Sequence, residues 1–138
     1  KTIVFITHDL DESLKIGDHI GILNAGKLVQ VGRPEEIIMN PADDYVEAFV
    51  KDVNRAKVLR AKTVMIKPEN FNGKEVKLAD TFKVSESTYI EEFLPNVLEN
   101  RCTIVVVDNK GDTKGYITEK QLAISLSKNS HRDSKKTL

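Results

Sequence analysis

Residues 2–7 form a continuous run of β-branched and aromatic side chains, TIVFIT, near the start of the 138-residue chain. An apolar run without polar alternation is typical of a strand that is buried on both faces, as in a parallel sheet. A second run of this kind, CTIVVVD, stands at residues 102–108. Because buried strands need helices to cover them, the two runs predict an α/β fold.

Turn and capping signals mark short elements after the first run. Asp9 and the acidic residues behind it begin a helix that Gly17 ends, and Asn24-Ala25-Gly26 is a hairpin turn. Pro34 begins another helix, which Asn40-Pro41 ends. The expected elements are a strand at 2–7, a helix at 9–17, a hairpin at 19–32, and helices at 34–40 and 43–52.

The middle of the chain, residues 53–81, is mixed, polar and basic, so we expect a connector there. Order returns after it, with Ser85-Glu86-Ser87 expected to cap a helix. The expected elements are a strand at 82–84, a helix through about 99, a strand at 102–108, a turn at 109–112, a strand at 114–118 and a helix at 119–128. Residues 129–138 have no apolar face and are expected to be disordered.

Composition excludes several classes of partner and site. Basic and acidic side chains both number 21, so the chain has no overall positive field for nucleic acid. Cys102 is the only cysteine, which excludes an intrachain disulfide and favours a cytosolic protein. His19 and His131 show no metal-ligand spacing with it, so no metal site is predicted.

Membrane and targeting signals are also weak. No apolar run approaches the roughly 20 residues that a membrane-spanning helix needs, so a membrane link is expected to run through a partner. The chain begins with Lys1, and its opening lacks the charge layout of a signal peptide. We therefore expect it to be a piece of a longer protein.

Residues 4–35, VFITHDLDESLKIGDHIGILNAGKLVQVGRPEE, resemble the end of an ABC-transporter ATPase domain. The resemblance implies a strand-helix-hairpin-helix arrangement and places His8 at the family's switch histidine, which contacts the γ-phosphate and helps to place the attacking water. An imidazole can donate the hydrogen bond that this role needs. The alternative is that His8 is a strand-end histidine without a catalytic role.

Other parts of an ATPase are missing from the sequence. It contains no G-x-x-x-x-G-K-[ST] phosphate loop, no acidic Walker B strand end and no LSGGQ-like signature. We expect these motifs upstream of Lys1. ATP and Mg²⁺ therefore belong to the parent protein, and this chain is not expected to hydrolyse ATP by itself.

Residues 40–59, NPADDYVEAFVKDVNRAKVL, resemble the join between the ATPase and regulatory domains of glycine betaine/proline importers. This resemblance implies an osmoprotectant importer. Its partners would be a second copy of the ATPase subunit and a transmembrane permease, with the subunit in the cytoplasm on the inner face of the membrane. The transported substrate is inferred from the resemblance alone.

Residues 82–127 resemble one CBS motif, which implies a β-α-β-β-α domain. The resemblance carries Thr118 to the hydroxyl position of an adenine-nucleotide site, and Gln121 to the position where the family has a ribose-binding Asp. A neutral amide replaces an acceptor-only carboxylate there. Its signature V-V-D-x-x-G-x-x-x-G-x-I-[ST] is matched by Val106, Val107, Asp108, Gly111, Gly115, Ile117 and Thr118.

The expected domains are therefore an ATPase end at 1–52, a linker with a truncated first CBS repeat at 53–81, a CBS motif at 82–128 and a tail at 129–138. A single CBS motif is small, so we expect it to pair with a second chain. Cationic residues of the tail, Arg132, Lys135 and Lys136, are either solvated or touch anionic lipids. Two other functions stay open: a free-standing CBS adenine-nucleotide sensor and a non-functional truncated product.

Overall fold

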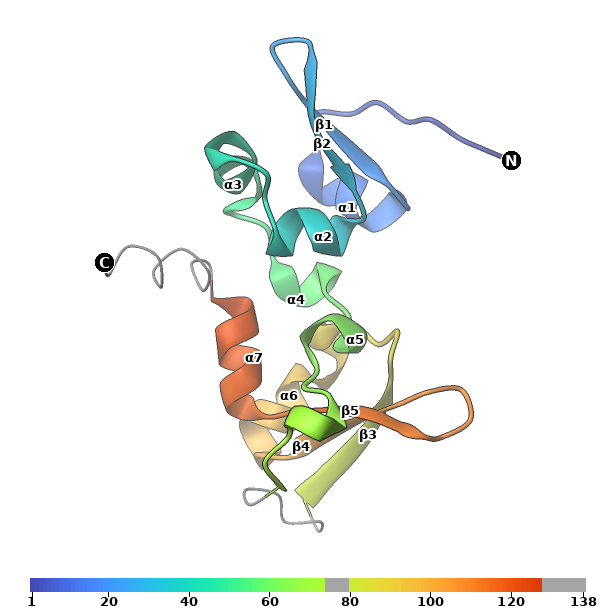
Figure 1. The fold of residues 1–138 in the computed structure, drawn as a ribbon, viewed down its shortest axis with the longest axis vertical. Coiled ribbons are helices and arrows are strands. Elements are labelled where there is room, and N and C mark those ends of the chain that lie inside the picture. Colours follow the sequence, from blue (N-terminus) through green and yellow to red (C-terminus); the bar gives the residue numbers. More distant parts are fainter. Residues whose placement is uncertain (74–79, 128–138) are drawn as a thin grey trace. The chain divides into compact units, whose positions relative to one another are not determined.

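The computed structural model describes residues 1–73 and 80–127 (Figure 1). The chain divides into two compact units, residues 1–54 and 55–138, called here the N-terminal and C-terminal units. Within the described residues, each unit holds helices and one small sheet, which confirms a mixed α/β fold. The tail at 129–138, for which we expected disorder, lies outside the described residues.

The N-terminal unit begins its regular structure with helix α1, Leu10–Ile16. The Asp9 carboxylate accepts a hydrogen bond from the Glu12 amide at 3.2 Å, and the Gly17 amide donates to the Ser13 carbonyl. An aspartate cap and a final glycine are the signals from which the sequence predicted this helix. The prediction is confirmed.

An antiparallel hairpin follows, with β1 at Ile20–Asn24 and β2 at Lys27–Gly32. Ala25 and Gly26 form its turn with φ values of 52° and 78°. Two residues with positive φ give the turn twist that fits paired strands. The predicted hairpin is confirmed.

Helices α2 (Pro34–Met39) and α3 (Asp44–Val50) complete this unit. The Gln30 side chain of β2 donates to the Asn40 carbonyl at 3.1 Å and accepts from the Ala42 amide at 2.9 Å, so it fixes the connection between the two helices. The buried apolar side chains of the unit come from its helices, from the hairpin and from the segment after α3: Leu14, Ile20, Ile22, Ile37, Ile38, Val46, Val50 and Val53.

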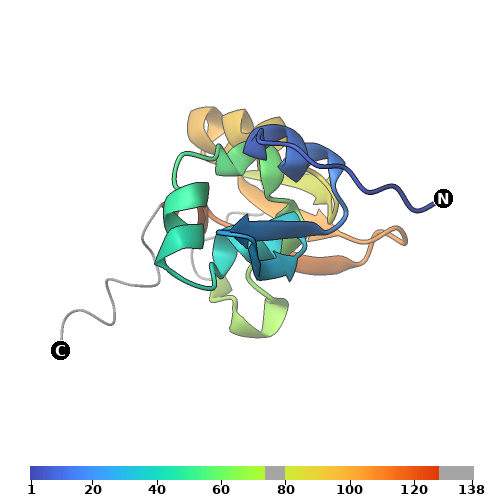
Figure 2. The same cartoon turned by 90° about the horizontal axis from the view of Figure 1, so that it is seen from above.

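The strand expected at residues 2–7 is absent from the structure, so this prediction is wrong for the chain by itself. The side chains of residues 3–6 are 62–92% exposed, and the segment leads away from the hairpin (Figure 1, Figure 2). A strand of a parallel sheet needs neighbours for its backbone groups. Among the described residues, no strand pairs with this segment.

The C-terminal unit contains the predicted order β-α-β-β-α. Its sheet has the strand order β3-β4-β5, with β3 parallel to β4 and β4 antiparallel to β5. The central strand carries three consecutive buried residues, as a strand covered on both faces should. The elements are β3 (Thr81–Ser85), α6 (Ile90–Asn100), β4 (Thr103–Val107), β5 (Thr113–Ile117) and α7 (Glu119–Leu126).

Helix α6 begins later than its expected cap at Ser85-Glu86-Ser87. The residue before its first turn is Tyr89, which provides no side-chain cap. Ser85 still pairs with Val107 in the parallel sheet, and its hydroxyl lies 3.0 Å from that of Thr88. Ser85 therefore ends β3, Glu86 and Ser87 lie in the turn that follows, and the hydroxyls of Ser85 and Thr88 stabilise that turn.

Residues 55–70, which we expected to be connector, form helices α4 (Arg55–Val58) and α5 (Ala61–Val64) and a 3₁₀ turn at Pro68–Asn70. They belong to the same unit as the sheet. The Ala61 amide donates to the Thr88 carbonyl at 2.8 Å, and the Ile90 amide to the Leu59 carbonyl at 3.1 Å. Because lysines and arginines alternate with the apolar residues in this segment, its composition suggested an exposed connector although most of its apolar side chains are buried.

Candidate functional site

His8 lies just before helix α1, and its side chain is exposed. The Thr7 hydroxyl accepts a hydrogen bond from the Asp9 amide at 3.0 Å, and Asp9 in turn caps the helix. Local hydrogen bonds therefore hold the backbone around His8 and leave its imidazole open to solvent.

The surroundings of His8 are open to solvent in the described part of the chain. The segment that carries it is exposed, and no group of three or more His, Cys, Asp or Glu side chains in residues 1–73 and 80–127 could hold a metal ion. ATP chemistry with Mg²⁺ needs phosphate-binding groups and metal ligands around the histidine. The role of His8 in ATP hydrolysis therefore stays a prediction.

Thr118 and Gln121 come together at the start of α7. Thr118 is the N-cap residue, and its hydroxyl oxygen accepts a hydrogen bond from the Gln121 amide at 3.1 Å. The Gln121 side-chain nitrogen donates to the Val64 carbonyl at 3.0 Å. The two predicted residues are thus adjacent, but the side-chain amide of Gln121 already donates a hydrogen bond to Val64, the last residue of α5.

Arg55 and Ser125 form a contact that sequence reasoning missed. A guanidinium nitrogen of Arg55 donates to the Ser125 carbonyl at 3.2 Å, near the C-terminal end of α7. Partial burial lowers the pKa of Arg55 below its ordinary value. A cation near the last carbonyls of a helix is favourable, but 70 residues separate the partners and no local signal joins them.

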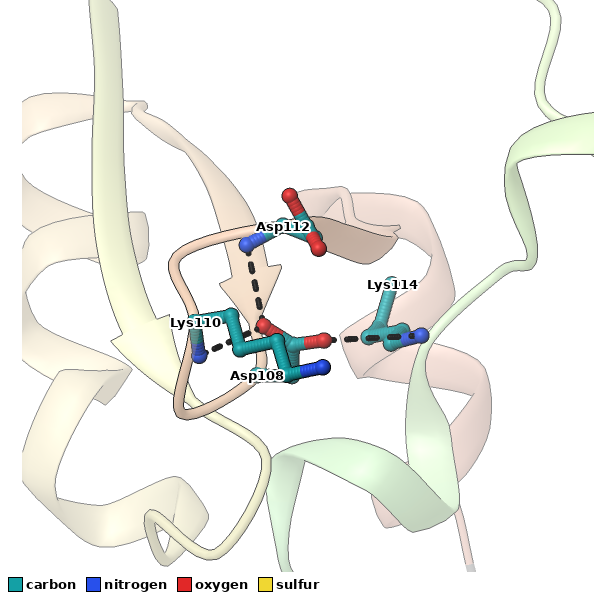
Figure 3. A network of polar contacts seen from close by, with 4 residues as sticks. All are labelled: Asp108, Lys110, Asp112 and Lys114. Atoms are coloured by element: carbon teal, nitrogen blue, oxygen red, sulfur yellow. Dashed lines mark hydrogen bonds and ion pairs between the residues drawn. The ribbon is translucent and has the colours of Figure 1, made fainter.

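Asp108 organises the turn between β4 and β5 (Figure 3). Its carboxylate accepts hydrogen bonds from the amides of Asp112 at 3.0 Å and Lys110 at 2.9 Å, and lies 3.5 Å from the Lys114 ammonium. The Asp112 amide, followed by the Lys110 amide and the Lys114 charge, lowers the pKa of Asp108, and partial desolvation opposes this only in part. One carboxylate oxygen is therefore bound within the turn, and the other pairs with Lys114 on β5.

Gly111 and Gly115, two glycines of the same motif, have different structural roles. Gly111 has a φ of 85°, which the turn needs. At Gly115 a Cβ atom would lie 2.7 Å from the Ile66 carbonyl oxygen and from the Met65 sulfur. The signature that suggested a CBS motif is therefore built for the turn and for close packing of residues 65–66 on β5.

No family model matches the chain. A glycine betaine/carnitine transport ATP-binding protein of Listeria monocytogenes is 61% identical over 72 residues, which are 52% of this chain and 18% of that protein. A glycine betaine transport ATP-binding protein of Bacillus subtilis is 58% identical over 69 residues, 50% of this chain and 16% of that protein.

A trimethylamine N-oxide transport system ATP-binding protein of Pelagibacter ubique is 39% identical over 117 residues, 85% of this chain and 33% of that protein. An alignment of this length exceeds the N-terminal unit, so the similarity reaches the C-terminal unit. The chain spans a third or less of the length of these relatives. Over about half of its length, the chain is therefore homologous to ATP-binding proteins of glycine betaine and carnitine transport. This is the family that its motifs resemble.

Proposed function

We propose that the chain is the C-terminal part of the ATP-binding subunit of an ABC importer for osmoprotectants such as glycine betaine or proline. The observation that carries this proposal is the 61% identity over 72 residues to a glycine betaine/carnitine transport ATP-binding protein. The other two relatives support it, since both are named as transport ATP-binding proteins.

Within such a subunit, His8 is the switch histidine and residues 2–7 are the buried strand that delivers it. The remainder of the subunit supplies the phosphate loop, the Mg²⁺ ligands and the neighbouring strands. Bound ATP and Mg²⁺ would supply the phosphoryl-transfer chemistry. The part of this protein described here would contribute one hydrogen-bonding side chain to it, and by itself is not an enzyme.

The C-terminal unit is a regulatory module of the CBS type in this proposal. Support comes from its β-α-β-β-α order and from the short parallel β3-β4 pair. Two copies of the subunit would face each other, and a permease would hold them at the cytoplasmic side of the membrane. No helix of the described residues is long and apolar enough to span a bilayer. A regulatory signal must bind one state of the dimer more tightly than another.

A free-standing adenine-nucleotide sensor is less well supported. It would have no use for the ATPase-like residues 4–35, and its ribose site would depend on a Gln121 amide that already donates to Val64. A non-functional truncated product would share the same fold, so activity has to separate it from a transport subunit.

The test grafts residues 1–138 onto the Listeria relative in place of its matching segment, with the relative's own permease. We expect ATP hydrolysis and betaine uptake to survive the graft. His8→Ala in the graft should lower ATP hydrolysis on the order of 10²- to 10³-fold, the usual cost of one transition-state donor. The matched control is His19→Ala, which removes another exposed histidine of the same unit and should leave the rate unchanged.

A folded graft without ATP hydrolysis would contradict the proposal. Equal rates of ATP hydrolysis in the His8 and His19 variants would show that His8 is not the switch histidine. The assignment of the chain to a transport subunit would not be affected.

A further inference from the structure

Residues 64–71 run beside β5 at the edge of the sheet. The Ile66 amide donates to the Tyr116 carbonyl at 2.8 Å, and the Tyr116 amide donates to the Ile66 carbonyl at 2.9 Å. This reciprocal pair is an antiparallel bridge to the side of β5 that faces away from β4. The segment therefore covers a strand edge that would otherwise present unpaired backbone groups.

Side chains hold the same segment at two further points. The Phe71 ring stacks on the Tyr116 ring with centroids 4.3 Å apart and planes 18° apart. Met65 packs where Gly115 leaves no Cβ, since such an atom would lie 2.7 Å from the methionine sulfur. The glycine at 115 is thus required by the segment that crosses it.

Gln121 fastens the beginning of the segment. Its side-chain nitrogen donates to the Val64 carbonyl at 3.0 Å, and Val64 is buried. A carboxylate at this position could not donate to a carbonyl, and two acceptors would then face each other. The amide therefore suits the Val64 carbonyl in the way that an aspartate would not.

We propose that residues 64–71 are a strap that closes over β5 and opens as a unit, and that Gln121 is the positioning residue that latches it. The partner of Gln121 is then the strap, and its amide is not available to a ribose. Opening of the strap would uncover the Tyr116 ring and the backbone edge of β5 together. The inference concerns the C-terminal unit alone and stands or falls independently of the transport role.

The first test is amide hydrogen exchange on the full chain, followed by NMR. The amides of Ile66, Tyr116 and Phe71 should share one protection factor, lower than that of the central-strand amides of Ile104 and Val106. Equal protection of the strap and the central strand would overturn the proposal, because the strap would then open only when the unit unfolds.

The second test changes the latch. Gln121→Glu should lower the protection of the Ile66 and Tyr116 amides by roughly five- to tenfold, the factor expected for one net hydrogen bond. Gln121→Lys keeps a donor and should retain most of the protection. Ala123→Glu places the same carboxylate on an exposed position of α7 and is the matched control, with no change expected.

Unchanged protection in the Glu variant, or an equal loss in the Lys variant, would overturn the latch. A titration with AMP gives a further check. AMP binding to the wild-type chain that is lost in Gln121→Met, while strap protection stays constant, would make Gln121 a ligand residue and also overturn the proposal.

Discussion

The two units contain similar apolar runs, one of which is buried in a sheet while the other is exposed. In the C-terminal unit, TIVVV is the central strand, and Val106 is 0% exposed between β3 and β5. In the N-terminal unit, TIVFIT pairs with no described strand, and Ile6 is 92% exposed. The side chains of the two runs have the same strand preference, so the difference lies in whether neighbours are present.

The comparison teaches that an apolar run shows that a segment requires neighbouring strands if it is to be buried. It does not show that the same chain supplies those strands. A strand becomes buried when other strands satisfy its backbone and helices cover its side chains. The C-terminal unit supplies both from its own residues. The N-terminal unit buries side chains only around a two-stranded hairpin and three short helices.

The largest expected difference between the units concerns phenylalanine. Phe93 on α6 is 1% exposed, and Phe5 is 62% exposed. Phe93→Ala should lower the free energy of unfolding of the C-terminal unit by about 3–5 kcal/mol, the usual cost of a deleted core ring. Phe5→Ala should change stability by less than about 0.5 kcal/mol. Urea unfolding followed by circular dichroism measures both free energies of unfolding. Similar losses in the two variants would contradict the expected difference between the buried and the exposed phenylalanine.

A smaller loss is expected where the strap crosses β5. Gly115→Ala places a Cβ against the Ile66 carbonyl and should cost about 1–3 kcal/mol, as overpacking usually does. Gly73→Ala is the matched control, because a Cβ atom at Gly73 would meet nothing within 4 Å and its φ lies outside the left-handed region. Urea unfolding of the two variants compares them, and a neutral Gly115 variant would show that the close packing is absent in solution.

Among the described residues, each unit also holds one non-glycine residue in the left-handed region. These are Ala25 in the hairpin turn, with a φ of 52°, and Arg101 after α6, with a φ of 50°. Ala25→Gly and Arg101→Gly should each raise the free energy of unfolding by roughly 0.5–1 kcal/mol, since glycine adopts this conformation without Cβ strain. Thermal unfolding would detect either gain. A loss at both positions would contradict the assigned turns.

The smallest effect concerns pH. The turn lowers the pKa of Asp108, so the folded state favours the ionised carboxylate. Its contribution to stability is present above the ordinary aspartate pKa of about 4 and is lost as pH falls through the lower folded value. The unfolding midpoint of Asp108→Asn should therefore fall less than that of the wild type between about pH 4 and pH 2. Parallel pH curves for the two proteins would argue against this turn contribution.

Local signals predicted most of the fold. Asp9 and Gly17 bound α1, Asn24-Ala25-Gly26 closes the hairpin, and Pro34 begins α2, because caps and turns act within a few residues. The β-α-β-β-α order followed from the apolar runs and the turn at 109–112, although the cap expected for α6 was misplaced. Adjacency of Thr118 and Gln121 was also predictable, since they are the cap and third residue of one helix.

Long-range contacts could not be predicted in this way. The bond from Gln121 to Val64 joins residues 57 apart, and the Arg55 bond to Ser125 joins residues 70 apart. Basic side chains between Leu59 and Val64 concealed the burial of α5. The catalytic role of His8 remains a prediction, because it depends on groups that this chain does not contain.

The most direct test compares the amide exchange of residues 3–6 in two settings, the chain alone and the chain grafted onto the Listeria relative. We expect exchange near the unstructured rate in the chain alone. In the graft we expect protection of roughly a hundredfold or more, as for a core strand. Equally fast exchange in a folded, active graft would contradict the claim that this segment is a core strand of an ATP-binding subunit, as would strong protection in the chain alone.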